Sequence, residues 1–204
     1  MVALRHCLSA AFDTVDHQLL LTRLKERFGV IGKALDWFQS YLHGRTYSVT
    51  NGTSTSDVVQ LLCSVPQGSV LGPLLFVLYT AEFVDIAAEM GIKIHMYADD
   101  TQLYIHCKLS DTVDAVAKLE RCIAVVDNWM AASRLKMNSD KSEVIWVGCR
   151  RTVSTHGCPA IRIGNDTICA TNKARLLGVL KSIDLTFDQH ASTSCVNSAL
   201  SVSR

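Results

Sequence analysis

The tetrapeptide 97–100, which ends in Asp99 and Asp100, lies between two stretches of alternating polarity. Residues 92–96 precede it and residues 103–107 follow it, so the pattern predicts two strands joined by a turn. Two adjacent carboxylates at such a turn each raise the proton affinity of the other unless a cation lies between them. Oxygen ligands at a tight turn suit Mg²⁺, although the dipeptide taken alone is also typical of a solvated turn.

The chain has 204 residues, of which 49% are apolar and 19% charged, and this predicts a folded domain with a sizeable core. Its longest apolar run, residues 70–81, contains Gly72 and Pro73 and is too short for a membrane span, so we expect no membrane segment. The N-terminus shows no secretory leader, and we expect an intracellular protein, with nucleus and cytoplasm left open.

The eight cysteines show no spacing typical of zinc sites or disulfide frameworks, and most are expected to be buried. A net charge of +1 is weak for a chain that binds phosphate backbones alone.

Hydrophobic periodicity and turn residues predict the other elements. Two local expectations concern helix starts: Asp13 is expected to cap the first helix with Asp16 in its first turn, and Ser110 to cap the last. We expect the segment 74–79, which is apolar all round, to be buried. The expected elements are helices at 13–28, 33–43, 73–90 and 111–132, the last with Val113 in its buried stripe, hairpins at 45–65 (turn Asn51-Gly52) and 161–168, a shaped loop at 66–73 and an irregular strand pair at 135–147 around a turn at 138–141.

Several segments, taken in order, resemble the successive palm motifs of reverse transcriptases. They read LSAAFDTVDH at 8–17, VPQGSVLGPLLF at 65–76 and YADD at 97–100. The likeness is greatest to the LINE-type, non-LTR retrotransposon branch, whose fourth motif resembles residues 129–143, while residues 177–179 resemble the segment leading to the thumb. The resemblance runs from about residue 3 to residue 190, and motifs in this order at plausible spacing are a specific signal.

This resemblance implies RNA-directed DNA synthesis by two-metal nucleotidyl transfer with Mg²⁺. The implied partners are an RNA template, a DNA primer and deoxynucleotides. Asp99 corresponds to the principal metal ligand, Asp100 to its supporting carboxylate, and Lys141 to the lysine that protonates or neutralises the leaving pyrophosphate. Taken alone, Lys141 is also typical of a solvated surface lysine.

The resemblance also implies substrate-binding residues. Phe12 corresponds to the bulky residue that packs under the sugar and excludes a 2′-hydroxyl. Gln67 and Gly68 correspond to the loop that contacts template and incoming nucleotide, where a glycine permits close backbone approach. Each has a simpler reading, because Phe12 could be a core residue and Gln67-Gly68 only a turn.

One motif departs from the family pattern. The first motif normally has a metal-bridging aspartate five residues before the aromatic residue, and here that position is Cys7. A thiol is a soft donor that is mostly protonated near neutral pH, whereas Mg²⁺ requires hard anionic oxygens. Arg5 and His6 also interrupt a strand expected to be buried. We therefore expect polymerase activity to be lost or very weak.

The fold class expected is α+β, a reverse-transcriptase palm with an antiparallel sheet backed by helices, with the fingers missing and the thumb truncated. Residues 1–190 would form this palm-like fragment, and residues 191–204 the truncated start of the thumb or a disordered tail. Two alternatives remain open. One is an active polymerase that uses Asp13 or another carboxylate in place of the missing ligand, and the other is a non-catalytic RNA-binding module.

Overall fold

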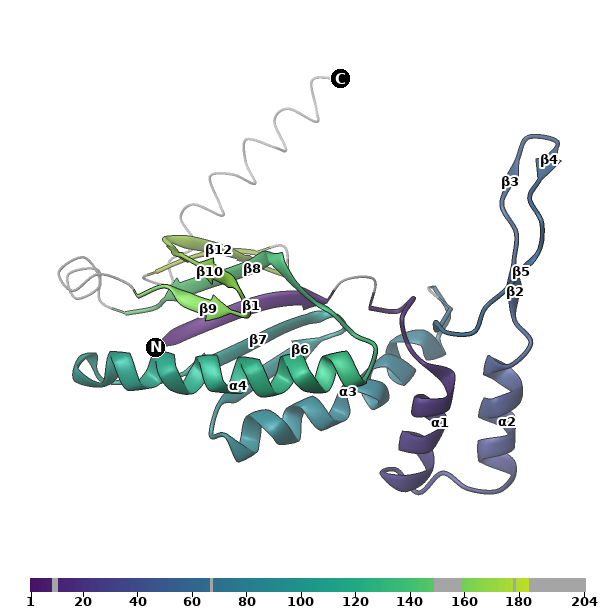
Figure 1. The fold of residues 1–204 in the computed structure, drawn as a ribbon, viewed down its shortest axis with the longest axis horizontal. Helices are drawn as coiled ribbons and strands as arrows, with labels where there is room; N and C mark the ends of the chain where they lie inside the picture. The colour runs from purple at the N-terminus through teal and green to yellow at the C-terminus, as the bar shows by residue number, and fades with distance from the viewer. Residues whose placement is uncertain (9–10, 67, 149–158, 178, 184–204) are drawn as a thin grey trace. The chain divides into compact units, whose positions relative to one another are not determined.

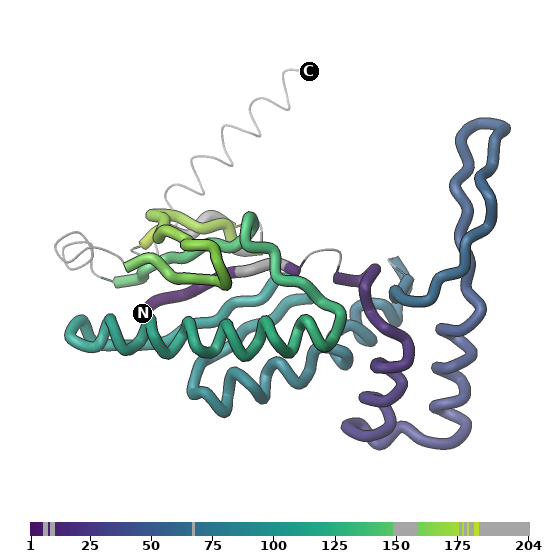
Figure 2. The backbone as a smooth tube through the Cα atoms, in the orientation of Figure 1, coloured from purple at the N-terminus to yellow at the C-terminus, as the bar shows by residue number. Residues whose placement is uncertain are grey.

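The computed structural model describes residues 1–8, 11–66, 68–148, 159–177 and 179–183 (Figures 1 and 2). The chain divides into two compact units, which we describe separately. The first contains Met1–Cys7, Asp85–Asp127 and Met137–Arg204, and the second contains Leu8–Val84 and Asn128–Lys136. The expected thumb start or tail at 191–204 lies outside the described residues.

The centre of the first unit is a five-stranded sheet with the strand order β11-β8-β1-β7-β6. Strand β1 lies in the middle and pairs antiparallel with β7, which in turn pairs antiparallel with β6. In contrast, β11 pairs parallel with β8, so the sheet is mixed and the prediction of an antiparallel sheet was wrong at this edge. The connection between β8 and β11 is long enough for the crossover that a parallel pair requires. The strands are β1 (Val2–Leu8), β6 (Lys93–Tyr97), β7 (Asp100–Ile105), β8 (Met137–Trp146) and β11 (Ala170–Thr171).

The predicted carboxylate-bearing hairpin is confirmed. Tyr97 and Asp100 are paired across β6 and β7, which leaves Ala98 and Asp99 as a two-residue turn. Ala98 has a positive φ of 53°, a conformation typical of such tight turns. The turn therefore fixes the backbone positions of both aspartates.

Residues 137–146 form one continuous strand, β8, so the prediction of an irregular strand pair with a turn at 138–141 was wrong. The hydrogen bonds typical of a turn are nevertheless present within residues 138–142. The side chain of Asn138 accepts a hydrogen bond from the Lys141 N–H at 3.2 Å, and its carbonyl accepts one from the Ser142 hydroxyl at 2.9 Å. Pairing within the sheet outweighs this local preference for a turn.

Helix α4 (Thr112–Ala132) runs along one face of this sheet (Figure 1). A short 3₁₀ turn, η1 (Leu109–Asp111), precedes it and contains Ser110, so the prediction that Ser110 caps the helix was wrong. Val113 is 76% exposed and does not belong to the core stripe as predicted. The buried residues of α4 are Ala115, Leu119, Cys122, Ile123, Val126 and Met130.

Short strands complete the first unit. The predicted hairpin at 161–168 is confirmed as β9 (Ile161–Ile163) and β10 (Asp166–Ile168). A second antiparallel pair is formed by β12 (Lys173–Leu176) and β13 (Val179–Ser182). Of the four cysteines whose side chains are described, all free, only Cys122 is buried, so the expectation of mostly buried cysteines was wrong for the others.

The second unit contains helices α1 (His17–Glu26) and α2 (Lys33–Leu42); α2 lies at its predicted position, whereas α1 begins four residues later than predicted. Asp16 is the N-cap of α1, because its carboxylate accepts a hydrogen bond from the Leu19 N–H at 2.9 Å. The prediction that Asp13 is the cap was therefore wrong, since Asp13 lies exposed in the preceding turn. Gly29, with φ at 65°, ends α1 as predicted, and the Val30 N–H donates back to the Leu24 carbonyl.

The predicted hairpin at 45–65 is confirmed, with its turn displaced by one residue. Asn51 pairs with Ser54, so the turn residues are Gly52 and Thr53 and not Asn51 and Gly52. In Figure 2 this hairpin extends away from the ends of α1 and α2. Its strands are β2 (Thr46–Tyr47), β3 (Thr50–Asn51), β4 (Ser54–Thr55) and β5 (Val59–Gln60), and all are exposed.

Helix α3 (Leu71–Glu89) starts two residues before Pro73 and crosses the boundary between the units. Leu75, Phe76 and Tyr79 are fully buried. Leu74 and Val77 are 51% and 52% exposed, so the prediction of a segment buried all round was wrong. By length and composition alone, α3 could also cross a membrane, which is a property shared by core helices of globular proteins.

Candidate active site

The sheet register places the position of the missing ligand beside the aspartate pair. Cys7 on β1 is the backbone partner of Asp100 on β7, and Arg5 is the partner of Gln102. Asp100 is buried, whereas Asp99 in the turn is partly exposed. The first and third sequence motifs therefore meet through paired strands of one sheet.

The side chain of Arg5 contacts Asp100 with one edge of its guanidinium group, the edge formed by Nε and Nη2. The guanidinium Nε donates to Asp100 Oδ1 at 2.9 Å and to Oδ2 at 3.1 Å, and Nη2 donates to Oδ2 at 3.1 Å. The remaining nitrogen, Nη1, donates to Glu143 Oε2 on β8 at 3.2 Å. One cation thus holds carboxylates from the two strands that flank β1.

Burial makes these contacts strong. The side chains of Arg5, Asp100 and Glu143 are 22%, 11% and 33% exposed. A bidentate guanidinium–carboxylate pair is about twice as strong as a neutral hydrogen bond, and low exposure reduces its screening by water. A charged residue in a central strand is costly without such a partner, which explains how β1 accommodates Arg5.

These residues do not fit a divalent metal centre of the kind that reverse transcriptases generally use. Both carboxylate oxygens of Asp100 are already bound by a cation, and the position opposite Asp100 carries a thiol and not a carboxylate. Among the residues that the structure describes, no group of three or more His, Cys, Asp or Glu side chains is arranged to hold a metal ion. The residues present therefore differ from the family's metal site in the ligands themselves.

Lys141, the predicted proton donor, lies on β8 with its side chain exposed. Its backbone N–H donates to the side-chain oxygen of Asn138 at 3.2 Å. Glu143, two residues further along the same strand, is the residue that reaches the site through Arg5. The proposed role of Lys141 toward pyrophosphate stays a prediction.

The predicted substrate-binding residues belong to the second unit. Phe12 is half-buried and packs on Phe76 with a ring-centroid distance of 4.8 Å. Gly68 is exposed with φ at 78°, a left-handed conformation that suits the predicted glycine loop. Gln67 lies outside the described residues. Within this unit the first and second motifs are joined directly, because the Val65 N–H donates to the Phe12 carbonyl at 2.9 Å.

The loop before α3 is shaped by close contacts. The Ser69 hydroxyl donates to the Pro66 carbonyl at 2.7 Å, and the Gly72 N–H donates to the same hydroxyl oxygen at 2.9 Å. A Cβ atom added at Gly72 would lie only 2.7 Å from the Pro66 carbonyl oxygen. Gly72 is therefore required by the shape of the loop.

We expect Gly72→Ala to lower the free energy of unfolding by about 1–3 kcal/mol, because the added methyl group forces the backbone of the loop to shift. Urea unfolding followed by circular dichroism measures this change. The matched control is Val70→Ala, since Val70 is 95% exposed in the same loop and its truncation should change the free energy by less than about 0.5 kcal/mol. Equal stability of Gly72→Ala and the parent chain would contradict the loop contact.

A second polar cluster, which sequence reasoning missed, joins α1, α3 and the C-terminal end of α4. Arg23 donates to the Tyr79 carbonyl at 2.6 Å and to the Ser133 hydroxyl at 2.7 Å, and it forms an ion pair with Glu82 at 3.3 Å. The indole N–H of Trp129 donates to the same Glu82 carboxylate at 2.7 Å. The Arg23 guanidinium also lies over the rings of Tyr79 and Trp129, at 4.6 and 5.0 Å. We call this set the Arg23 cluster.

The buried hydroxyl of Tyr79 gives this cluster a pH dependence. It donates to the Ser133 carbonyl at 2.6 Å, and burial raises the pKa of Tyr79 above its usual value. Since the folded state retains the proton more tightly than the unfolded state, stability is present below pH of about 10 and is lost as the pH rises above it.

We expect the free energy of unfolding to fall above pH of about 10, and to fall less steeply in a Tyr79→Phe variant that carries no titrating hydroxyl there. Chemical denaturation at about five pH values between about 8 and 11 measures how steeply the free energy of unfolding falls with pH in each protein. The control is Tyr47→Phe, because Tyr47 is 50% exposed. Identical alkaline slopes for all three proteins would contradict the assignment to Tyr79.

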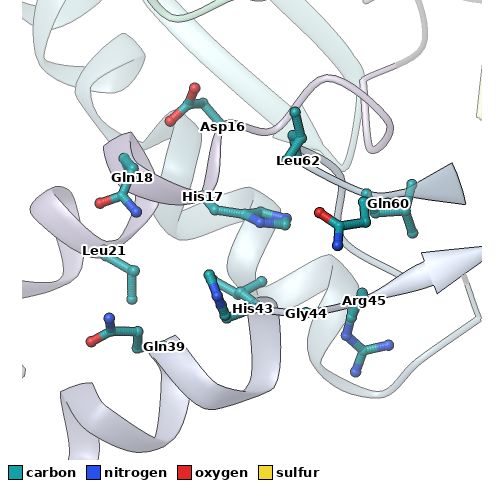
Figure 3. Close-up of a pocket in the computed structure, with 12 residues that line it drawn as sticks. Asp16, His17, Gln18, Leu21, Gln39, His43, Gly44, Arg45, Gln60 and Leu62 are labelled. Carbon is teal, nitrogen blue, oxygen red and sulfur yellow. The ribbon is translucent and has the colours of Figure 1, made fainter.

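The second unit also contains a polar pocket of about 280 Å³ between α1, α2 and the base of the hairpin (Figure 3). Its walls include His17, His43 and Arg45 together with three glutamine side chains. The Nε2 atom of His17 lies 2.7 Å from the Ser64 carbonyl oxygen and must carry the proton, because that oxygen can only accept. None of the predicted site residues is among those that line this pocket, and no periodicity or spacing in the sequence indicated it.

The same fold occurs in solved structures. The chain superimposes on apo telomerase from Candida tropicalis truncated from the C-terminal domain with a TM-score of 0.61 at 15% identity, covering 92% of this chain and 34% of that one. Telomerase from Candida albicans in complex with a fragment of telomeric RNA gives a TM-score of 0.57 at 13% identity, covering 89% and 31%. The predicted palm fold is therefore confirmed, with the correction that its sheet is mixed.

The family described as reverse transcriptase (RNA-dependent DNA polymerase) matches residues 5–180, and the chain belongs to this family. A relative from Drosophila funebris, the RNA-directed DNA polymerase from mobile element jockey, is 30% identical over 185 residues, which is 88% of this chain and 19% of that protein. The probable RNA-directed DNA polymerase from transposon X-element of Drosophila melanogaster is 28% identical over 187 residues, again covering 88% and 19%. These relatives confirm the LINE-type, non-LTR branch, and the chain spans about a fifth of their length.

Proposed function

We propose that this chain is the palm of a LINE-type reverse transcriptase in which DNA synthesis is lost or very weak. The whole protein of such an element would copy an RNA template into DNA from a DNA primer and deoxynucleotides. The chain supplies the hairpin with Asp99 and Asp100, the first-motif segment with Phe12 and the loop with Gly68. The family matches over residues 5–180 support this assignment.

The contact between Arg5 and Asp100 is the single observation that carries the proposal of lost activity. The Arg5 guanidinium occupies an acceptor site on each oxygen of Asp100 and places a positive charge beside it, which opposes the approach of a metal ion. Cys7 removes the second carboxylate expected beside it. If the two changes together remove about 4 kcal/mol of transition-state stabilisation, the rate falls roughly a thousandfold.

Primer extension on an RNA template, with Mg²⁺ and then Mn²⁺, tests the proposal. We expect the unmodified chain to show no extension above the level of an Asp99→Asn control, which removes the principal ligand expected from the family. An unrelated active reverse transcriptase under the same conditions confirms that the assay works. Extension by the unmodified chain that disappears in Asp99→Asn would overturn the proposal.

An active polymerase that uses Asp13 is the second candidate. The observation in its favour is that Asp16, and not Asp13, caps α1, while Asp13 lies exposed in the preceding turn. If the unmodified chain extends the primer and Asp13→Asn abolishes that extension, this second candidate replaces the first. Extension that survives Asp13→Asn would exclude it.

A further inference from the structure

We infer that the Arg5 guanidinium is the resident cation of Asp100 and Glu143, so this part of the sheet needs no metal ion and restoring Cys7 to aspartate alone does not create a metal site. The inference deepens the proposed function and rests on it in one respect, because it takes position 7 to be the place of the missing metal-binding aspartate. It names Arg5, a residue outside the family motifs, as the group that determines whether the carboxylates can bind a divalent cation.

Arg5 is hydrogen-bonded to two carboxylates. Arg5 makes three hydrogen bonds with the two oxygens of Asp100 and a fourth with Glu143. The three side chains come from β7, β1 and β8, which are neighbours in the sheet. The cation on the central strand therefore contacts a carboxylate on each side, and the order of the strands places it between them.

The register also explains why Arg5 can reach Asp100. Arg5 is paired with Gln102, and Asp100 lies two residues from Gln102 on the same strand. Residues two apart in a strand share a face of the sheet, so Asp100 is a diagonal neighbour of Arg5 within reach of its long side chain. The same register places position 7 directly opposite Asp100.

A divalent ion would have to compete with this guanidinium for Asp100. An aspartate introduced at position 7 would add another carboxylate two residues from Arg5 on the same strand, and the Arg5 guanidinium is already bound to Asp100. Removal of the guanidinium frees both oxygens of Asp100 from this competition. The effects of changing Arg5 and Cys7 on metal binding are therefore expected to be strongly coupled.

The test is a set of four proteins: the unmodified chain, Arg5→Met, Cys7→Asp and the double variant. Binding of Mn²⁺ is followed by electron paramagnetic resonance, with no nucleic acid present. We expect the unmodified chain and Cys7→Asp to bind no Mn²⁺ up to about 1 mM, and the double variant to bind at least about tenfold more tightly than Cys7→Asp. Equal Mn²⁺ affinity of Cys7→Asp and the double variant would overturn the inference.

Thermal unfolding gives an independent measurement. We expect Mn²⁺ and EDTA to leave the Tm of the unmodified chain unchanged, and Arg5→Met to lower it by about 5 °C because two carboxylates lose their shared cation. Arg121→Met is the matched control, since Arg121 is exposed on α4 in the same unit, and its Tm should change by less than about 1 °C. Stabilisation of the unmodified chain by Mn²⁺ that disappears in Asp100→Asn would overturn the inference.

If Arg5→Met does not fold, two further variants keep the question decidable. Arg5→Lys retains the charge without the fork and should fold with an intermediate Tm, and Arg5→Met with Asp100→Asn removes both buried charges and should recover part of the loss. If the Tm of that double variant is no higher than that of Arg5→Met, the result would count against the pairing of Arg5 with Asp100. Because these readouts involve no DNA synthesis, primer extension by the unmodified chain would refute the proposed function without deciding this inference.

Discussion

Arg23→Met is expected to lower the free energy of unfolding by about 3–5 kcal/mol. The Arg23 side chain is only 11% exposed, and its loss would leave the Tyr79 carbonyl and the Glu82 carboxylate without their cation. Methionine retains most of the apolar stem, so the change reports on the guanidinium and less on lost packing. Guanidinium chloride unfolding, followed by circular dichroism, measures the difference in the midpoint at constant slope.

The matched control is Lys25→Met, because Lys25 is an exposed cation on the same helix. Its effect should remain within about 0.5 kcal/mol. A further variant, Glu82→Gln, should lose part of the same free energy and should show less than additive loss when combined with Arg23→Met. Full additivity of the two substitutions would show that Arg23 and Glu82 act separately and would contradict the Arg23 cluster.

Phe76→Ala is expected to cost about 3–5 kcal/mol, since it removes a large side chain that is fully buried in the second unit. The cavity would also leave Phe12 without the ring on which it packs, at a centroid distance of 4.8 Å. Chemical denaturation measures the cost. The neighbouring Val77→Ala serves as the control, because Val77 is 52% exposed and its truncation should cost much less.

Comparison with Phe12→Ala separates the two readings of Phe12. As a core residue alone, Phe12 would lose nearly as much stability on truncation as Phe76. As a residue that presents one face to a nucleotide sugar, half-buried Phe12 should lose clearly less, about 1–2 kcal/mol. Equal losses for the two variants would favour the core reading and count against the predicted contact with the sugar.

Much of the fold could be predicted because it depends on local patterns. The hairpin around Ala98 and Asp99 and helix α2 were found from alternation, helical period and turn residues. The wrong predictions concern features that depend on contacts between segments far apart in the sequence. Strand β8 is continuous because it pairs within the sheet, and the parallel pairing of β11 depends on a crossover that no local pattern shows. Likewise, the choice of Asp16 over Asp13 as cap depends on where α1 actually begins.

The candidate site was predictable in its motifs and not in its contacts. The sequence identified position 7 as the departure from the family and Arg5 as an unusual charge in a strand expected to be buried. It did not indicate Glu143 as a partner, because that contact joins strands separated by 138 residues in the chain. A charge at a buried strand position does signal that a partner must exist, and the register of β1 and β7 shows which one it is.

A crystal structure of the unmodified chain grown with Mn²⁺ tests the central claim most directly, because Mn²⁺ is located by its anomalous scattering. We predict that the Arg5 guanidinium remains on both oxygens of Asp100 and that no anomalous peak lies within ligand distance of that carboxylate. A manganese ion bound by Asp100, with Arg5 displaced, would contradict the claim that this reverse transcriptase palm has replaced its metal ion by an arginine.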